Sequence, residues 1–187
     1  MEKDVSRSGG GTVHGGPAGA GHPAPDDAAG VVRMLRRRWA SGVVIVLAAT
    51  RDGGYRGITA TSFMVVSEEP PLLAIAVRND GEFAALLEQG AGLTVSLLES
   101  EHEFVAERFA GRAPLPDRLL TGIKHRIDGD LPIMADALGW CRGAITQIVP
   151  AGDHLLAIVQ VVQGGAGVDT DDPLLRYEGR YRRLEAG

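Results

Sequence analysis

The fold of this chain is decided by residues 43–66, VVIVLAATRDGGYRGITATSFMVV. Val43 to Thr50 is rich in β-branched residues, which favour strands because they pack well on the pleated surface of a sheet. Asp52-Gly53-Gly54 follows as a tight-turn signal, and a second strand is predicted from Tyr55 to Val66. The segment therefore predicts two antiparallel strands, the second of which carries several hydroxyl side chains.

Outside this hairpin, predicted strands outnumber predicted helices. Asp26 and Asp27 offer N-cap oxygens, and apolar residues recur at helical spacing up to Trp39, which predicts an amphipathic helix ending near Gly42. Because the strands are short, evenly spaced and mostly joined by tight turns, the expected fold class is mainly β, a barrel with a few peripheral α-helices. The other predicted elements are strands at 72–77, 93–98, 140–149, 155–162 and 177–184, helices at 82–89 and 101–110, and a Pro/Gly-rich loop before residue 140.

The composition divides the chain into a tail and one domain. Residues 1–25 consist mostly of Gly, Pro, Ala and Ser, with too few apolar side chains to offset the entropy lost on ordering. They are predicted to form a disordered N-terminal tail, and residues 26–187 a single folded domain. The one cysteine, Cys141, permits no disulfide within the chain, and no apolar run reaches the ~20 residues that cross a bilayer. A cytoplasmic protein without a membrane partner is expected.

Several common kinds of functional site are missing from the sequence. A formal net charge of −5 argues against a nucleic-acid binder, which needs a dense basic patch. No GxGxxG follows a predicted strand and no P-loop pattern occurs, so neither of these nucleotide sites is available. HExxH, paired Cys/His ligands and GxSxG are also missing, so no metal is expected. A nucleotide cofactor would have to be bound by another device.

Two stretches remain as candidate binding sites. Gly57 to Phe63 carries three hydroxyls within four residues, and hydroxyls together with main-chain N–H groups can satisfy phosphate oxygens or the polar edge of a flavin ring. An ordinary Thr-rich strand is the alternative interpretation. Gly152-Asp153-His154 lies between two predicted strands, where a functional histidine and a solvated turn histidine are both compatible with the pattern.

A series of segments along the chain resembles the flavin reductase family of FMN-binding split barrels, the reductase components of two-component monooxygenases. These segments are Trp39 to Val46, Gly57 to Phe63, Val66 to Leu72, Glu107 to Gly111, Ala151 to His154, and Pro173 to Tyr181. The resemblance covers residues 31 to about 184. It implies a Greek-key split β-barrel, an NAD(P)H-dependent reduction of FMN or FAD, a homodimer that shares the flavin site, and a partner monooxygenase that receives the reduced flavin.

The resemblance also implies roles for individual residues. His154 would be the catalytic position, placing NADH or NADPH against the flavin ring. Arg78 would supply positive charge to the flavin phosphate, and Phe109 would pack beside the cofactor. The implied cofactor contacts are Thr59, Ala60, Thr61, Ser62, Ser67, Val77, Arg78, Asn79, Phe109, Gly152, Asp153 and Tyr181.

The chain departs from the family pattern in one turn. Many relatives have a Ser/Thr-rich turn after the segment that matches Val77 to Asn79, whereas this chain has Asp80-Gly81-Glu82. Two carboxylates there would repel a phosphate, so the choice between FMN and FAD stays open.

Three other functions are compatible with the sequence. The chain could be an oxidoreductase related to pyridoxamine-phosphate oxidase on the same barrel, a non-catalytic flavin-binding or sensor protein, or a β-barrel interaction module without a cofactor. NADH oxidation that rises with added flavin would favour the reductase over the pyridoxamine-phosphate oxidase relative. Bleaching of the bound flavin by NADH or NADPH would favour it over the non-catalytic flavin-binding protein. Binding of flavin would itself exclude the interaction module without a cofactor.

Overall fold

The computed structural model describes residues 27–112, 119–170 and 172–184. The predicted disordered tail, residues 1–25, and part of the predicted Pro/Gly-rich loop lie outside these ranges. The chain divides into two compact units, residues 1–36 and 37–187. Helix α1 (Ala28–Arg38) begins with a hydrogen bond from the Gly30 N–H to the Asp27 carboxylate. The predicted amphipathic helix is therefore confirmed, although it ends at Arg38 rather than near Gly42.

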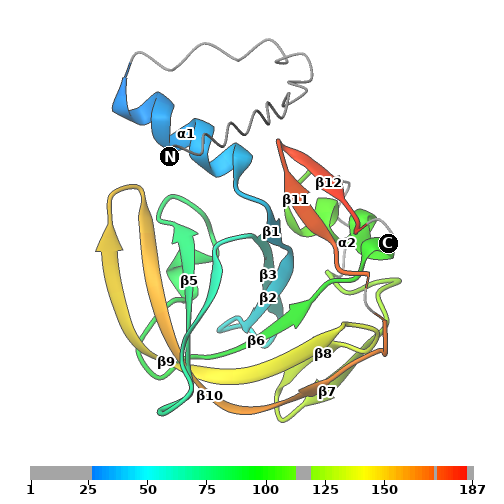
Figure 1. Cartoon of the computed structure of the whole chain (residues 1–187). Coiled ribbons are helices and arrows are strands. Elements are labelled where there is room, and N and C mark those ends of the chain that lie inside the picture. The colour runs from blue at the N-terminus through cyan, green and yellow to red at the C-terminus, as the bar shows by residue number, and fades with distance from the viewer. Residues whose placement is uncertain (1–26, 113–118, 171, 185–187) are drawn as a thin grey trace, which may run out of the picture. The chain divides into compact units, whose positions relative to one another are not determined.

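Seven antiparallel strands form the main sheet of the second unit, which confirms the mainly β fold class (Figure 1). Their order across the sheet is β3-β2-β6-β9-β10-β5-β4. Several neighbours in this order are far apart in the chain, as in Greek-key sheets. The strands are β2 (Val44–Ala49), β3 (Tyr55–Ala60), β4 (Phe63–Ser67), β5 (Leu72–Arg78), β6 (Gly92–Leu97), β9 (Gly139–Ala151) and β10 (His154–Ala166).

Strands β3 and β4 follow each other directly in the chain but lie at opposite edges of this sheet. The chain leaves β3 at Ala60 and enters β4 at Phe63, which pairs with Ile75 of β5. Between them, the Ser62 hydroxyl donates a 2.7 Å hydrogen bond to the Ala76 carbonyl oxygen. The two edges of the sheet therefore approach each other along this segment, and the sheet curls into a barrel that is split between its edge strands, β3 and β4.

The single strand predicted from Tyr55 to Val66 is wrong, because the chain breaks at Thr61 and Ser62. Strand β3 pairs with β2, whereas β4 pairs with β5. A twisted sheet that curls toward closure changes strand direction at such a corner, so one straight strand cannot serve both partners. The run of small and hydroxyl-bearing residues at this point permits the change.

Alternate residues of β2 enter two different cores. Side chains of a strand point to opposite faces in turn, and both faces of β2 are covered, which explains its uninterrupted apolar sequence. One core fills the barrel, and the other lies between the sheet and the elements packed outside it. The residues on the barrel side are Val44, Val46 and Ala48, and those on the outer side are Ile45 and Leu47, together with Val43 just before the strand.

Short elements cover the outer core or connect the strands. They are β1 (Ser41–Gly42), η1 (Ala84–Leu86), η2 (Ser100–His102), α2 (Glu103–Phe109), β7 (His125–Asp128), β8 (Leu131–Met134), β11 (Leu175–Tyr177) and β12 (Arg180–Arg182). The helix predicted at 101–110 is confirmed as η2 and α2. The helix predicted at 82–89 is only the single turn η1, because Leu87 already has extended backbone. Across the described ranges, no helix is both long and apolar enough to span a membrane.

Two hairpins differ from the prediction. The strand predicted at 177–184 is replaced by β11 and β12, which turn at Glu178 and Gly179. Strands β7 and β8 lie where a loop was predicted, and Gly129 between them has a φ of +66°. The Asp128-Gly129 pair is typical of tight hairpin turns. However, β7 is mostly exposed and β8 is buried throughout, so neither shows the alternation that identifies a half-buried strand.

Gly57 lies where β3 passes closest to the ring of Phe109 in α2. A Cβ atom at this position would lie 2.6 Å from Leu47 Cδ2 and 2.6 Å from Phe109 Cε1, and both of these side chains are buried. We expect Gly57→Ala to lower the free energy of unfolding by about 1–3 kcal/mol, because overpacking forces a buried ring to shift. Chemical denaturation measures the change. Gly42→Ala is the control, since a Cβ there meets nothing within 4 Å, and equal stability of the two variants would contradict this account.

Candidate functional site

The turn between β9 and β10 holds the predicted catalytic histidine. Gly152 has a φ of +64°, a conformation that glycine adopts without strain. His154 Nδ1 lies 2.7 Å from Asp153 Oδ1, and this hydrogen bond lowers the pKa of Asp153 below its usual range. The contact orients the imidazole ring while leaving the side chain 33% exposed. A histidine oriented in this way at a surface turn can face a ligand.

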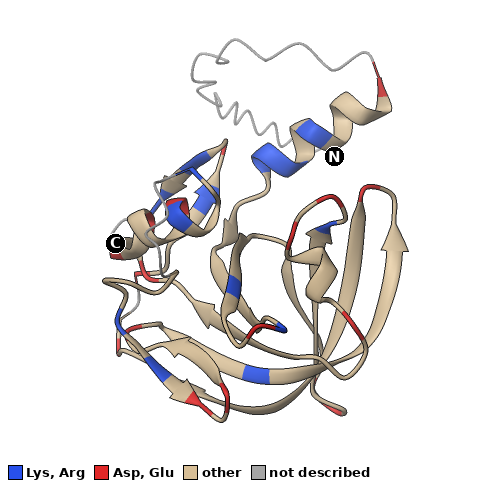
Figure 2. Ribbon diagram, turned by 180° about the vertical axis from the view of Figure 1, so that it is seen from behind, with Lys and Arg blue, Asp and Glu red and all other residues tan. Residues whose placement is uncertain are grey.

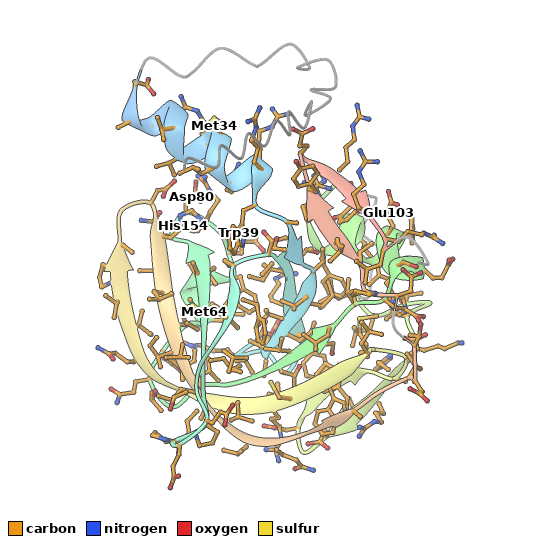
Figure 3. All side chains as sticks on the ribbon, viewed as in Figure 1. Met34, Trp39, Met64, Asp80, Glu103 and His154 are labelled. Carbon is orange, nitrogen blue, oxygen red and sulfur yellow. The ribbon has the colours of Figure 1, made fainter. Side chains whose placement is uncertain are left out.

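Arg78 ends β5 directly opposite His154 in the register of β5 and β10. Its Nε and Nη2 atoms lie 2.9 and 2.6 Å from the two carboxylate oxygens of Asp80, and its Nη1 atom lies 3.8 Å from Asp153 Oδ2. The hydrogen bond from Arg78 lowers the pKa of Asp80. Figure 3 shows Asp80 and His154 at the same end of this strand pair. The guanidinium therefore faces two carboxylates.

Asn79 links the end of β5 by hydrogen bonds to the turn that precedes His154. Its backbone N–H donates to the Asp153 carbonyl oxygen at 3.1 Å, and its side-chain amide donates to the Gly152 carbonyl oxygen at 3.3 Å. These bonds link two segments more than seventy residues apart in the chain. The structure thus brings together five predicted site residues, namely Arg78, Asn79, Gly152, Asp153 and His154.

The hydroxyl-bearing break borders the same place. Ser62 bonds to Ala76, two residues before Arg78, which corresponds to about 7 Å along a strand. Thr61 and Ser62 are both exposed. We call the region formed by Thr61, Ser62 and the five residues at the ends of β5 and β10 the β5–β10 corner. Seven of the thirteen predicted site residues therefore lie in one region.

The other predicted site residues lie away from this corner or are buried. The Thr59 hydroxyl donates a 2.6 Å hydrogen bond to the Ala106 carbonyl oxygen of α2, and Phe109 packs in the outer core. Ala60 and Val77 are buried inside the barrel, so their side chains serve packing. Ser67 lies five residues beyond Ser62, about 17 Å further along β4. Cofactor contacts by these residues stay predictions.

Tyr181 belongs to a cluster on the C-terminal hairpin, where Figure 2 shows basic residues on β11 and β12. Arg112 binds both carboxylate oxygens of Glu107 and donates a 3.2 Å hydrogen bond to Tyr181 Oη. The Arg176 guanidinium carbon lies 4.4 Å from the centroid of the Tyr181 ring. A cavity of about 540 Å³ is lined in part by these side chains. The cofactor contact implied for Tyr181 also stays a prediction.

The Glu107–Arg112 pair makes stability depend on pH. The hydrogen bonds from Arg112 lower the pKa of Glu107, so the carboxylate stabilises the folded chain above its unfolded pKa of about 4.3 and loses this contribution as the pH falls. We expect Glu107→Gln to cost about 0.5–1 kcal/mol at neutral pH and progressively less below about pH 4. Thermal unfolding followed from neutral to acidic pH measures this. Parallel Tm profiles for the two proteins would contradict the assignment.

Three features of the β5–β10 corner bear on whether its residues fit a flavin. The exposed hydroxyls of Thr61 and Ser62 match the polar edge of the ring. Met64 of β4, two residues beyond Ser62, is an exposed apolar side chain that matches the apolar part of a ring system. Figure 3 labels Met64 on this strand. The phosphate end fits less well, because Asp80 already binds Arg78.

Asp80 is the residue whose contact the sequence did not predict. Its carboxylate was expected only to repel a phosphate, but it forms a two-pronged ion pair with Arg78. The signal available in the sequence is an arginine two residues before an aspartate at the end of a strand. That spacing permits the pair but does not require it, because the turn conformation decides whether the two side chains meet.

A cavity of about 680 Å³ lies around the β2–β3 turn, at the other end of β3 from Thr61, and contains none of the predicted site residues. Within the part of the chain that the structure describes, no group of three or more His, Cys, Asp and Glu side chains is arranged to hold a metal ion. The corner is instead identified by its hydrogen bonds, its charges and its exposed side chains.

Comparison with proteins of known sequence identifies one family. The family described as "Flavin reductase like domain" matches residues 35–185. The reductase component of 4-hydroxyphenylacetate 3-monooxygenase from Thermus thermophilus is 37% identical over 147 residues, which cover 79% of this chain and 91% of that protein. An NADH:FMN oxidoreductase from Rhodococcus qingshengii is 33% identical over 160 residues, which cover 83% of this chain and 81% of that protein.

Solved structures agree with this match. The NADH:FAD oxidoreductase of Streptomyces globisporus, in complex with NAD and FAD fragments, has a TM-score of 0.76 and 26% identity, and the match covers 89% of this chain and 98% of that chain. The flavin reductase of styrene monooxygenase from Pseudomonas putida has a TM-score of 0.72 and 28% identity, covering 83% and 98%. Both matches therefore extend over nearly the whole of the solved chain.

Proposed function

The chain belongs to the family of flavin reductase-like domains, and we propose that it is an NAD(P)H-dependent flavin reductase that acts on FMN or FAD. The observation that carries the proposal is the convergence of seven predicted site residues at the β5–β10 corner. The relatives named as NADH:FMN and NADH:FAD oxidoreductases support the choice of nicotinamide and flavin as the two reactants.

Residues of the corner have distinct proposed tasks. A bound flavin supplies the capacity to accept a hydride from a dihydronicotinamide, so the protein needs mainly to position the two rings and exclude water. His154, held by Asp153, positions the nicotinamide. Thr61 and Ser62 hold the polar edge of the flavin ring, and the apolar side chains of β4 keep water from its face. None of these tasks requires a strong acid or base.

The proposed function is tested by flavin binding followed by reduction. FMN and FAD are titrated into the purified full chain, and NADH or NADPH is then added without oxygen while the visible absorbance of the flavin is followed. The proposal expects binding at micromolar concentrations and bleaching by at least one nicotinamide. A chain that binds neither flavin contradicts it, and a chain whose bound flavin resists both nicotinamides is a flavin-binding protein without this activity.

His154 provides a sharper test of the site. We expect His154→Ala to raise the KM for the nicotinamide or lower kcat by about tenfold or more, because an oriented contact to one reactant is lost, while the Kd for the flavin stays within about threefold. Steady-state kinetics and flavin titration measure the two effects. His125→Ala is the matched control, since this exposed histidine lies on β7. Unchanged kinetics in His154→Ala would remove His154 from the site.

We also propose that the protein is a homodimer and that it passes reduced flavin to a monooxygenase. The first part is supported by β4, which is an edge strand of the main sheet and exposes Met64, Val65 and Val66. Exposed apolar edge strands are favoured sites of association. The second part is supported by relatives that are named as reductase components of monooxygenases. A cytoplasmic location stays a prediction.

Substitution on β4 tests the dimer. We expect Val65→Asp to shift the chain from dimer to monomer in analytical ultracentrifugation, because a buried unpaired carboxylate costs several kcal/mol at an interface. Ile127→Asp is the control, since Ile127 is also an exposed β-branched apolar side chain but lies on β7. A wild-type chain that sediments as a monomer, or equal dissociation by both variants, would contradict an interface through β4.

A further inference from the structure

The charges of the β5–β10 corner do not favour an anion. Arg78 is its positive residue, and two carboxylates face that guanidinium, Asp80 at 2.6 to 2.9 Å and Asp153 at 3.8 Å. One positive and two negative formal charges leave this group with a net charge of −1. Glu82 is the other acidic residue of the Asp80-Gly81-Glu82 turn, and its Oε2 atom lies 3.3 Å from Nε of Arg56 in β3. Both arginines bordering this turn are therefore engaged by its acidic residues.

The geometry of the Arg78 contact is the one that a phosphate requires. Guanidinium groups bind carboxylates and phosphates alike through two parallel N–H donors. Asp80 accepts from Nε and Nη2, which form one such pair, and Asp153 faces the remaining Nη1 atom. A phosphate that used the Nε and Nη2 donors would have to displace Asp80, and a phosphate at Nη1 would lie beside Asp153. A ligand that lacks a phosphate would meet neither obstacle.

We propose that Asp80 acts as an internal competitor for Arg78, so that the site recognises the isoalloxazine and ribityl parts of a flavin and discriminates little between riboflavin and FMN. This inference rests on the proposed flavin reductase function. Asp80 is two residues from Arg78, so the competition is intramolecular and present at every ligand concentration. The pair is solvent-exposed, and exposed ion pairs are weak, so Asp80 reduces phosphate affinity without abolishing it.

The competition has a functional consequence. A flavin whose phosphate is weakly held dissociates more readily, because most differences in affinity between related complexes lie in the dissociation rate. Asp80 would therefore favour flavin as a diffusing substrate over flavin as a permanently bound group. Such behaviour suits a chain that delivers reduced flavin to a second protein.

Quenching of flavin fluorescence measures the Kd of riboflavin and of FMN for the full-length chain at low salt. We expect the wild-type values for the two flavins to agree within about threefold, since the phosphate adds little net attraction. Asp80→Asn should tighten FMN binding by about five- to tenfold and leave riboflavin within about twofold, because Arg78 is released for the phosphate. Adding Arg78→Ala to Asp80→Asn should remove the gain.

Glu82→Gln is the matched control. It removes the same charge from the same turn, but from a carboxylate that faces Arg56 rather than Arg78. Equal tightening of FMN by Glu82→Gln and Asp80→Asn would mean a general charge effect and overturn the inference. A wild-type preference for FMN above about tenfold, or no gain in Asp80→Asn, would overturn it as well. Binding of neither flavin by the wild type would overturn the proposed function first, and this inference with it.

Discussion

Between Ala60 and Phe63 the chain passes from one edge of the main sheet to the other, held by the hydrogen bond from the Ser62 hydroxyl to the Ala76 carbonyl oxygen. This crossing lets β3 pair with β2 while β4 pairs with β5, and it leaves the barrel split between the edge strands β3 and β4. Because the crossing segment is not part of a regular strand, Thr61 and Ser62 are exposed at the surface. The same constraint that curls the sheet therefore creates the binding surface of the β5–β10 corner.

The antiparallel pairing of β5 and β10 brings charge to this surface. The register places Arg78 opposite His154, and the bonds made by Asn79 fix the histidine turn against the end of β5. Both of these side chains then have an immediate partner, because His154 contacts Asp153 and Arg78 contacts Asp80. The corner is consequently organised before any ligand arrives, and a reaction that depends on alignment of two rings benefits from such preorganisation.

The two faces of β3 separate packing from this chemistry. Ile58 and Ala60 contribute to the barrel core, whereas Gly57 and Thr59 face α2. Gly57 has no space for a side chain against Phe109, and the Thr59 hydroxyl is used by the Ala106 carbonyl oxygen. The hydroxyl-rich segment therefore has two roles along its length: its first part packs against α2, and its last two residues form the exposed break.

The amino-acid sequence was enough to predict the mainly β class, the apolar strands, helices α1 and α2 and the family, because apolar patterning, turn signals and the order of motifs are read along the chain. It also identified the His154 turn and the hydroxyl-bearing segment. The folded chain was needed to show that residues 55–66 belong to two strands at opposite sheet edges, that Thr59 and Phe109 pack with the outer core, and that Asp80 binds Arg78. These features depend on contacts between distant segments or on the conformation of one turn, and neither is encoded in the periodicity of a single strand.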